Sequence, residues 1–265
     1  MVKSWSFSAP STFSAVKTLD LRTLPFASLS GAGNMAADEA MLLSAAEHGR
    51  ASSRTYSWAE PTLTLGYFQE ARVRSDDPLI ADLAWVRRST GGATIVHDPA
   101  TELTYSLALP AGAEWQAKGV SWICRMHEFL RETLETVWGV ESKLVVCGAE
   151  QKLGPILCFR HQTPGDLLVG GHKIAGSAQR KHKGALLQHG SILLRQSPFA
   201  PNLPGLLELT QKAIAPHELA IALARRIAVE TGWHLHPGPW TDNELTSAKR
   251  IEIEKYGSAA WNEKR

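Results

Sequence analysis

Two side chains with nucleophilic chemistry, Cys158 and Lys173, lie in the part of the chain richest in reactive residue types. Cys158 follows the short apolar run Ile156-Leu157 and precedes a polar segment typical of a loop. A nearby ammonium group lowers the pKa of a thiol and so raises its thiolate fraction at neutral pH. The pair therefore indicates covalent nucleophilic chemistry. The alternative is a cysteine that only packs in the core, and His161 is a candidate base without an assured geometry.

A tight hairpin would present Lys173. Leu167 to Val169 has the pattern of a short strand, and Gly170-Gly171 suits a two-residue turn because glycine tolerates positive φ. The returning strand, from His172 to Ala178, carries the lysine. It also contains small residues that leave room for another group against the backbone: Gly176, Ser177 and Ala178.

A second candidate segment, Arg87-Arg88-Ser89-Thr90-Gly91-Gly92, links a strand expected at 83–87 to one at 93–97. Glycine lets backbone amides approach an anionic group, and arginine supplies planar donors. A Gly-Gly hairpin with two solvated arginines is the alternative. The segment is not a nucleotide P-loop, because the spacing Gly-x-x-x-x-Gly-Lys-Ser/Thr is absent.

The remaining patterns supply helices and strands around these segments. Apolar residues at helical spacing predict a helix over 121–137, in which Cys124 packs, and two further helices between 219 and 251. Asn34 is expected to cap a helix that ends at Gly49, and 54–58 and 62–66 are expected to form two adjacent strands. A strand over 185–194 carries His189, which suits either an acyl-binding role or a hydrogen-bonded structural one.

Composition is that of a soluble globular protein. The chain has 265 residues, of which 44% are hydrophobic and 20% charged, so neither disorder nor a membrane span is indicated. The net charge of +2 is too small to argue for nucleic acid as a partner. Three cysteines without Cys-x-x-Cys spacing predict neither a disulfide framework nor a zinc site. With no apolar run typical of a signal peptide, we expect a cytoplasmic protein.

Several stretches together resemble the biotin/lipoate protein ligase superfamily, in particular its lipoate-ligase-like octanoyltransferases. They are Asn34-Met35-Ala36-Ala37-Asp38-Glu39, Arg87 to Ala93 with His97-Asp98, Glu102 to Ser106, and the stretch from Asp166 to Leu194. The resemblance implies an α+β fold with mixed or antiparallel β-sheets flanked by helices. It implies one catalytic domain over 20–265, with a core to about 195 and packing helices in 215–265, after an N-terminal extension, 1–19.

The resemblance also implies roles for individual residues. Cys158, in Cys158-Phe159, matches the nucleophile of the transferase branch, and Lys173 matches a lysine found in both branches. Pro164-Gly165-Asp166-Leu167 departs from the transferase pattern, in which Pro-Ser and then Tyr-Glu-Leu follow, so the acyl donor stays open. The substrate-binding residues are expected to be Arg88, Gly91, Gly92, His97, Gly176, Ser177, Ala178 and His189.

The activity implied is transfer of an octanoyl group from acyl carrier protein to a lysine of a lipoyl carrier domain, through a thioester on Cys158. A thioester is already activated, so no cofactor and no metal are expected. The alternatives are an ATP-dependent lipoate-protein ligase, which would need ATP and Mg²⁺, and a non-catalytic scaffold that binds acyl carrier protein. We expect a monomer with no nucleic-acid or membrane partner.

Overall fold

Among the residues that the computed structural model describes, 18–112, 121–152, 159 and 161–265, nine strands form a mixed main sheet. The strands of the main sheet are β1 (Asp20–Thr23), β2 (Ala27–Leu29), β3 (Ala51–Trp58), β7 (Glu102–Leu109), β8 (Lys143–Leu144), β11 (Leu167–Val169), β12 (His172–His182), β13 (Ala185–Leu193) and β14 (His234–Pro237). Their order is β14-β1-β3-β7-β13-β12-β11-β8, with β2 also paired to β3.

Parallel pairing is confined to one side of this sheet. β1 is parallel to β14 and to β3, and β2 is parallel to β3, whereas the pairs from β3 through β7 to β8 are antiparallel. Two smaller sheets are formed by β4 (Thr62–Leu65), β5 (Ala84–Arg87) and β6 (Ile95–His97), and by β9 (Gln151–Lys152) with β10 (His161–Gln162). The expected α+β class with mixed sheets is confirmed.

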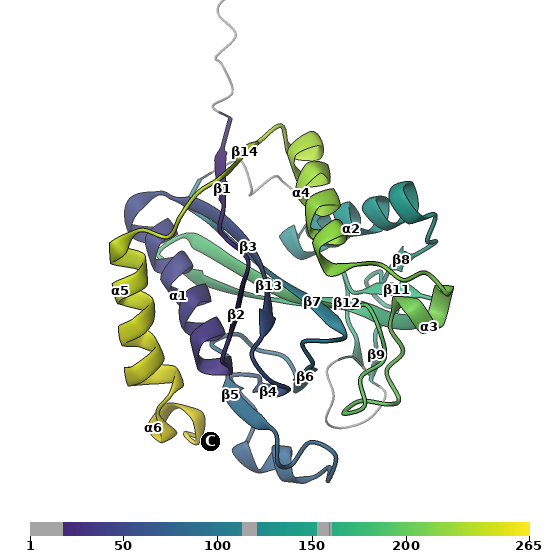
Figure 1. Cartoon of the computed structure of the whole chain (residues 1–265), viewed down its shortest axis with the longest axis horizontal. Helices are drawn as coiled ribbons and strands as arrows, with labels where there is room; N and C mark the ends of the chain where they lie inside the picture. Colours follow the sequence, from purple (N-terminus) through teal and green to yellow (C-terminus); the bar gives the residue numbers. More distant parts are fainter. Residues whose placement is uncertain (1–17, 113–120, 153–158, 160) are drawn as a thin grey trace, which may run out of the picture.

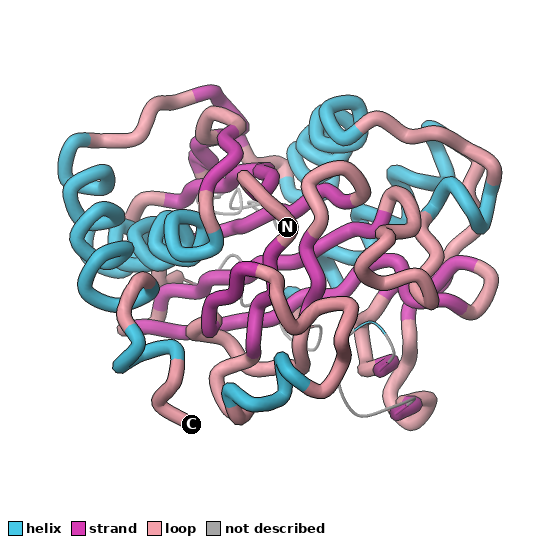
Figure 2. Tube along the Cα trace, turned by 60° about the horizontal axis from the view of Figure 1, so that its bottom comes forward, coloured by secondary structure: helices cyan, strands magenta, loops and turns pink. Residues whose placement is uncertain are grey.

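Helices cover both faces of the main sheet. α1 (Gly31–His48) packs beside α5 (Asp242–Ile251), and α2 (Trp122–Trp138) packs beside α4 (Pro216–Thr231). Figures 1 and 2 show the strands running between these two groups. The short elements are α3 (Leu206–Thr210), α6 (Ala259–Asn262), a 3-10 helix (Ala71–Ser75) and a π-helical segment (Glu252–Tyr256).

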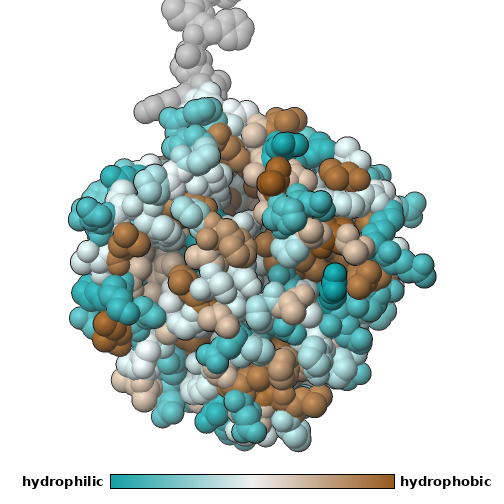
Figure 3. Space-filling view, viewed as in Figure 1, coloured by the Kyte–Doolittle hydropathy of each residue, from teal (hydrophilic) through white to brown (hydrophobic). Residues whose placement is uncertain are grey.

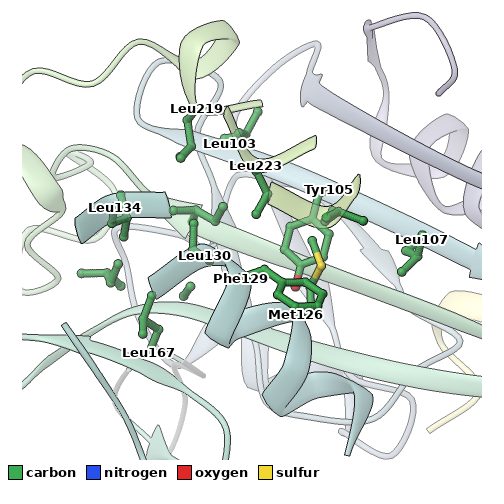
Figure 4. Close-up of a cluster of buried hydrophobic side chains, with 14 of the residues drawn as sticks. Leu103, Tyr105, Leu107, Met126, Phe129, Leu130, Leu134, Leu167, Leu219 and Leu223 are labelled. Atoms are coloured by element: carbon green, nitrogen blue, oxygen red, sulfur yellow. The ribbon is translucent and has the colours of Figure 1, made fainter. Parts of the chain in front are cut away.

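The side chains of β7 point alternately to the two faces of the main sheet, so this strand contributes to the apolar core on both faces. Leu103, Tyr105 and Leu107 join the large apolar cluster with α2 and α4, as Figure 4 shows. Ala108 points to the other face, where it packs with Met41 of α1. Successive side chains of a strand point to opposite faces, so this central strand contacts both helix layers.

On the face shown in Figure 3, apolar residues gather in several patches between polar ones. Among the residues that the structure describes, no helix has both the length and the apolar character to cross a membrane.

α1 begins earlier than the sequence pattern predicts. Its N-cap is Ser30, whose hydroxyl accepts a hydrogen bond from the backbone N–H of Gly33 at 3.0 Å. Asn34 is buried inside the helix, and its amide donates to the carbonyl oxygens of Leu29 and Ser57. The prediction that Asn34 is the N-cap was therefore wrong. Serine and asparagine both favour the N-cap position, so the sequence alone does not distinguish Ser30 from Asn34. Only their hydrogen-bond partners in the fold do so. The predicted end at Gly49 is correct, with φ of 66°.

The strands predicted at 54–58 and 62–66 exist but are not adjacent. β3 lies in the main sheet, whereas β4 pairs with β5 and β6 in a separate sheet. The turn after Trp58 thus moves the chain from one sheet to the other. Strand pairing depends on residues far apart in the sequence, so two strands that follow each other along the chain need not pair. The prediction that these two strands are adjacent was therefore wrong.

Candidate active site

A cavity of about 390 Å³ collects nearly all of the residues singled out from the sequence. This volume is within the range of about 300 to 1,000 Å³ that is usual for small-molecule sites. Its lining includes every predicted site residue that the structure describes: Lys173, Arg88, Gly91, Gly92, His97, Gly176, Ser177, Ala178 and His189. Cys158 lies outside the described residues. Apolar side chains, among them Met35, Trp58, Ile95 and Phe159, contribute much of the wall.

Two acceptors among the described residues hold Lys173 in the cavity. Its Nζ lies 2.7 Å from Oδ2 of Asp166, in an ion pair whose side chains are each 3% exposed. It also donates to the carbonyl oxygen of His161 at 3.1 Å. The same Asp166 oxygen accepts from the N–H and the hydroxyl of Thr163, at 2.7 and 3.0 Å. The turn that carries Asp166 thus fixes the position of the lysine ammonium.

Phe159, the residue after Cys158 in the sequence, lies beside this lysine. The Phe159 side chain is buried, and Nζ of Lys173 lies 5.4 Å from the centre of its ring. This distance allows a cation–π contact. The fold therefore brings the immediate sequence neighbour of the candidate nucleophile next to the lysine ammonium.

The small residues of β12 and β13 make room for side chains of the site itself. A Cβ at Gly176 would lie 2.6 Å from Cε of Lys173, so the lysine side chain lies across this glycine. A Cβ at Gly190 would lie 2.5 Å from Oγ of Ser177. The sequence predicted free space against the strand backbone, and at both positions part of that space is taken by a functional side chain.

The two arginines before the glycine loop are buried rather than solvated. Arg88 donates to the carbonyl oxygens of Thr64, Gly91 and Ala93 at 2.9 to 3.0 Å. Arg87 donates to the carbonyl oxygens of Gly66 and Asn262. The alternative of two solvated arginines is therefore wrong, and both guanidinium groups hold the shape of the loop.

His189 belongs to a buried hydrogen-bonded network beneath this loop. Its Nδ1 lies 2.8 Å from Oδ2 of Asp38, and its Nε2 lies 2.8 Å from Oγ1 of Thr90. Asp38 also pairs with Arg54 at 2.7 Å. Burial alone would raise the pKa of Asp38, but the Arg54 guanidinium and the hydrogen bond from His189 lower it. These hydrogen bonds connect His189 to α1 through Asp38 and to the glycine loop through Thr90.

His97 is held in a similar way at another wall of the cavity. Its Nδ1 lies 2.7 Å from Oε1 of Glu102, its Nε2 lies 2.9 Å from Oγ1 of Thr64, and its ring stacks on Trp58 at 3.9 Å. Burial lowers its pKa, although Glu102 opposes this effect. These hydrogen bonds fix the position of the His97 imidazole in the wall of the cavity.

Sequence reasoning missed three residues of the site: Asp38, Asp166 and His127. Asp38 and Asp166 lay within the motifs but had no assigned partner. His127 is fully buried on α2, where Nδ1 lies 2.5 Å from the carbonyl oxygen of Gly165 and Nε2 lies 2.6 Å from Oγ of Ser177. Its place on the apolar face of the predicted helix was the only available signal.

Metal ligands are not assembled in the part of the chain that the structure describes. Within it, no three His, Cys, Asp or Glu side chains are grouped so that they could hold a metal ion. What the cavity offers is an ammonium group, fixed hydrogen-bond donors and an apolar wall. These groups suit the binding of an acyl chain with a polar reacting end.

The sequence matches a known family over most of its length. The model of the lipoyl protein ligase A/B catalytic domain matches residues 30–215. An octanoyltransferase LipM of Brevibacillus brevis is 30% identical over 271 residues, which cover 89% of this chain and 96% of the relative. The octanoyltransferase LipM of Geobacillus kaustophilus is 32% identical over 269 residues, covering 88% and 94%.

Solved structures agree with the fold. A crystal structure of lipoate-protein ligase A bound with ATP has a TM-score of 0.75 and 21% identity, over 92% of this chain and 99% of that one. A putative lipoate protein ligase from T. acidophilum has a TM-score of 0.76 and 21% identity, over 93% and 100%. At such identities the likeness concerns the fold alone.

Proposed function

The chain belongs to the family of the lipoyl protein ligase A/B catalytic domain and is an acyltransferase, and we propose that it transfers an octanoyl group from acyl carrier protein to a lysine of a lipoyl carrier domain. The family and the enzyme class expected from the motifs are thereby confirmed, which sets aside the non-catalytic scaffold. The main support for the reaction is the ammonium of Lys173, fixed by Asp166 at 2.7 Å and next to Phe159, the residue that follows Cys158.

In the first half-reaction, the Cys158 thiolate attacks the carbonyl carbon of the octanoyl thioester. The thiol of the carrier's pantetheine leaves, and the octanoyl group stays on Cys158. Lys173 favours the thiolate by its positive charge and donates to the carbonyl oxygen as negative charge develops there. A fixed donor of this kind supplies roughly 3 kcal/mol of transition-state stabilisation. Asp166 keeps the ammonium in place throughout.

The octanoyl chain lies along the apolar wall formed by Met35, Trp58 and Ile95. Burial of the six methylene groups of an octanoyl chain at roughly 0.8 kcal/mol each contributes about 5 kcal/mol before the cost of ordering the chain. In the second half-reaction, the amine of the carrier-domain lysine attacks the enzyme thioester and releases Cys158. No ATP enters either step, because the bond that is broken is already a thioester.

The test is the intact mass of the protein after incubation with octanoyl-acyl carrier protein in the absence of ATP. We expect a gain of one octanoyl group that hydroxylamine removes, and no gain in a Cys158→Ser variant. Cys147→Ser serves as the matched control, since Cys147 is exposed and outside the cavity.

The same experiment separates the ligase alternative. If wild-type protein forms no adduct, and a lipoyl domain is modified only after octanoate or lipoate is added with ATP and Mg²⁺, the protein is an ATP-dependent ligase. Pyrophosphate release would then accompany modification.

A further inference from the structure

Cationic side chains gather around the glycine loop and residues 264–265. Lys255 lies among them and pairs with Glu39 at 2.6 Å. Within the part of the chain that the structure describes, the other members of this cation cluster form no ion pair: Arg87, Arg180, Lys264 and Arg265. Like charges held close together destabilise a compact protein unless an opposite charge joins them. The cation cluster therefore indicates an anionic ligand.

Two members of the cation cluster are buried and keep their positive charge uncancelled. The Nη2 of Arg87 and the Nζ of Lys264 have no hydrogen-bond partner among the described residues. Nζ of Lys264 lies between the rings of Tyr67 and Trp261, at 3.5 and 3.3 Å from their centres. Burial and the charges of the neighbouring cations lower the pKa of Lys264 to about 8. These two groups supply a positive potential without being placed to contact a ligand.

The other two members are open to solvent. Arg265 is exposed and Arg180 is half-buried. The guanidinium carbon of Arg265 lies 5.4 Å from the ring centre of Phe68, which is 70% exposed. A Cβ at Gly91 would lie 4.0 Å from the same phenyl ring, so this ring lies beside the cavity wall to which Gly91 belongs. Arg265 is therefore close to the glycine loop.

Arg180 lies beyond the cavity on the strand that carries Lys173. Gly176 and Ala178 of β12 line the cavity, and Arg180 follows them on the same face of the strand because side chains alternate. The Lys173 side chain lies across Gly176. The four residues from Gly176 to Arg180 span roughly 13 Å of extended strand. A ligand with its reacting end at Lys173 thus meets Arg180 at about this distance.

A guanidinium group has donors for more than one partner. Arg180 donates through Nη1 to the carbonyl oxygen of Ser89 at 2.8 Å, which ties its side chain to the glycine loop. Arginine has five N–H donors in a planar fork, so this bond leaves others for a ligand. Such a fork matches the oxygens of a phosphate group.

We propose that Arg180 and Arg265 bind the phosphate group of the acyl donor's pantetheine arm at the rim of the cavity, while the thioester of the same arm lies at Lys173. This inference rests on the proposed function. The arm carries its thioester at one end and a phosphodiester at the other, and when extended it spans on the order of 15 Å, for bonds near 1.5 Å. This length suits the separation along β12. The buried charges of Arg87 and Lys264 strengthen the attraction.

The test compares two small acyl donors that differ only in the phosphate, octanoyl-pantetheine and octanoyl-4′-phosphopantetheine. The rate of protein acylation without ATP, followed by intact mass, gives a half-saturating concentration for each donor. In the wild type, this concentration should be lower for the phosphorylated donor by about tenfold or more, the factor that a hydrogen bond between charged groups contributes. The preference should shrink as NaCl is raised from about 0.05 to 0.5 M, because salt screens exposed charges.

Variants distinguish phosphate binding from support of the fold. Arg180→Gln and Arg265→Gln should each move the ratio of the two half-saturating concentrations toward one, and the double variant should bring it close to one. A residue that only supported the fold would raise both concentrations together and leave their ratio unchanged. Arg72→Gln is the matched control, because Arg72 is 83% exposed, pairs with Glu70 and lies outside the cavity. Its ratio should equal that of the wild type.

Several outcomes would overturn the phosphate site. Equal half-saturating concentrations in the wild type would do so, as would an unchanged ratio in the double variant. If the variants weaken the use of octanoyl-acyl carrier protein alone, the cation cluster binds acidic side chains of the carrier, and the phosphate assignment is wrong. If Arg180→Gln does not fold, Arg265→Gln carries the test. Absence of acylation by every thioester donor would refute the proposed function and the site together, whereas acylation without a preference for phosphate would refute the site only.

Discussion

At the scale of single residues, Lys173 has a position that leaves it little freedom. Asp166 and the carbonyl oxygen of His161 both accept from its ammonium, and Gly176 gives the side chain a path across β12. A fixed charge is worth more to a developing oxyanion than a mobile one, because it needs no reorganisation during the reaction.

Lys173→Ala should slow acylation of the protein by about 100-fold or more, since it removes a preorganised donor to the thioester oxygen. Pre-steady-state formation of the acyl-enzyme measures this step. Lys249→Ala is the control, because Lys249 is 69% exposed on α5 and outside the cavity. Wild-type acylation rates in Lys173→Ala would remove the role proposed for the lysine.

Two neighbouring carboxylates on α1 illustrate how burial determines the contribution of an ion pair to the stability of the fold. Asp38 and Arg54 are each 2% exposed, whereas Glu39 and its partner Lys255 are about a fifth exposed, at 19% and 22%. Removing one partner of a buried pair leaves an uncompensated charge. A pair that is partly open to solvent is partly screened and contributes less.

We expect Asp38→Asn to lower the free energy of unfolding by about 3 kcal/mol or more, and Glu39→Gln by about 1 kcal/mol or less. Urea unfolding at pH 7 measures both. The substitutions change the charge by the same amount on the same helix, so an equal loss in the two variants would contradict the argument from burial.

Buried histidines also predict how stability depends on pH. Burial lowers the folded-state pKa values of His97 and His127 below the unfolded value of about 6.5. Below that pH the unfolded chain binds protons that the folded protein resists. Their contribution to stability is present above pH 6.5 and is lost as the pH falls toward the folded-state values.

The free energy of unfolding should therefore fall as the pH is lowered from about 7 to 5, by at most about 1.4 kcal/mol per pH unit for each histidine. Urea titrations at several pH values measure the slope. His127→Gln should reduce it, and His217→Gln should leave it unchanged because His217 is exposed. A steeper slope in His127→Gln would reverse the assigned direction of the pKa shift.

At the scale of elements, local chemistry made some parts predictable. Gly170 and Gly171 have φ of 56° and 84°, as the predicted two-residue turn between β11 and β12 requires. Ser121 caps α2 and Gly139, with φ of 60°, ends it, close to the predicted limits. In both cases the signals lie inside the element, so no knowledge of distant partners was needed.

Where partners are distant, the same reasoning was insufficient. β1 and β14 were not predicted, since each has only four residues and they pair with one another across the length of the chain. Asn34 was mistaken for a cap because its acceptors, Leu29 and Ser57, belong to neighbouring backbone that the sequence pattern does not place.

The end of β4 positions the glycine loop by close contact of two backbones. A Cβ at Gly66 would lie only 1.8 Å from the carbonyl oxygen of Gly92. Real Cβ contacts of this kind do not occur, so any side chain at residue 66 must push the loop away. The loop carries Gly91 and Gly92 in the cavity wall.

Gly66→Ala should therefore both destabilise the protein and raise the KM for the acyl donor, because the loop moves relative to Lys173. Gly112→Ala is the matched control, since a Cβ there meets nothing within 4 Å. Steady-state kinetics and thermal unfolding of the two variants test this. If Gly66→Ala kept the wild-type KM, the loop would not form part of the donor site.

At the scale of the whole molecule, the site draws on segments spread over most of the described chain. Asp38 comes from α1, His127 from α2, Lys173 from β12 and His189 from β13. The motifs identified most of the lining residues by type. They could not assign the pairs Asp38–His189 and His127–Ser177, because such contacts follow from the packing of helices on opposite faces of the sheet.

The last residues of the chain also support the glycine loop. α6 lies against the outer edge of β5, beside the point marked C in Figure 1. Oδ1 of Asn262 accepts from the backbone N–H of Arg87 at 2.9 Å, and the Arg87 side chain donates to the Asn262 carbonyl oxygen at 2.9 Å. Asn262 also donates to the carbonyl oxygen of Tyr256 at 2.7 Å.

Asn262→Ala should lower the free energy of unfolding by about 1 to 3 kcal/mol, the usual penalty for leaving buried polar groups without partners. It should also raise the KM for the acyl donor, because β5 leads directly into Arg88 and the glycine loop. Asn243→Ala is the control, since Asn243 is exposed on α5. If Asn262→Ala lost stability without any change in KM, the tail would support β5 alone, and the loop would keep its shape through Arg88 and its bonds to Thr64, Gly91 and Ala93.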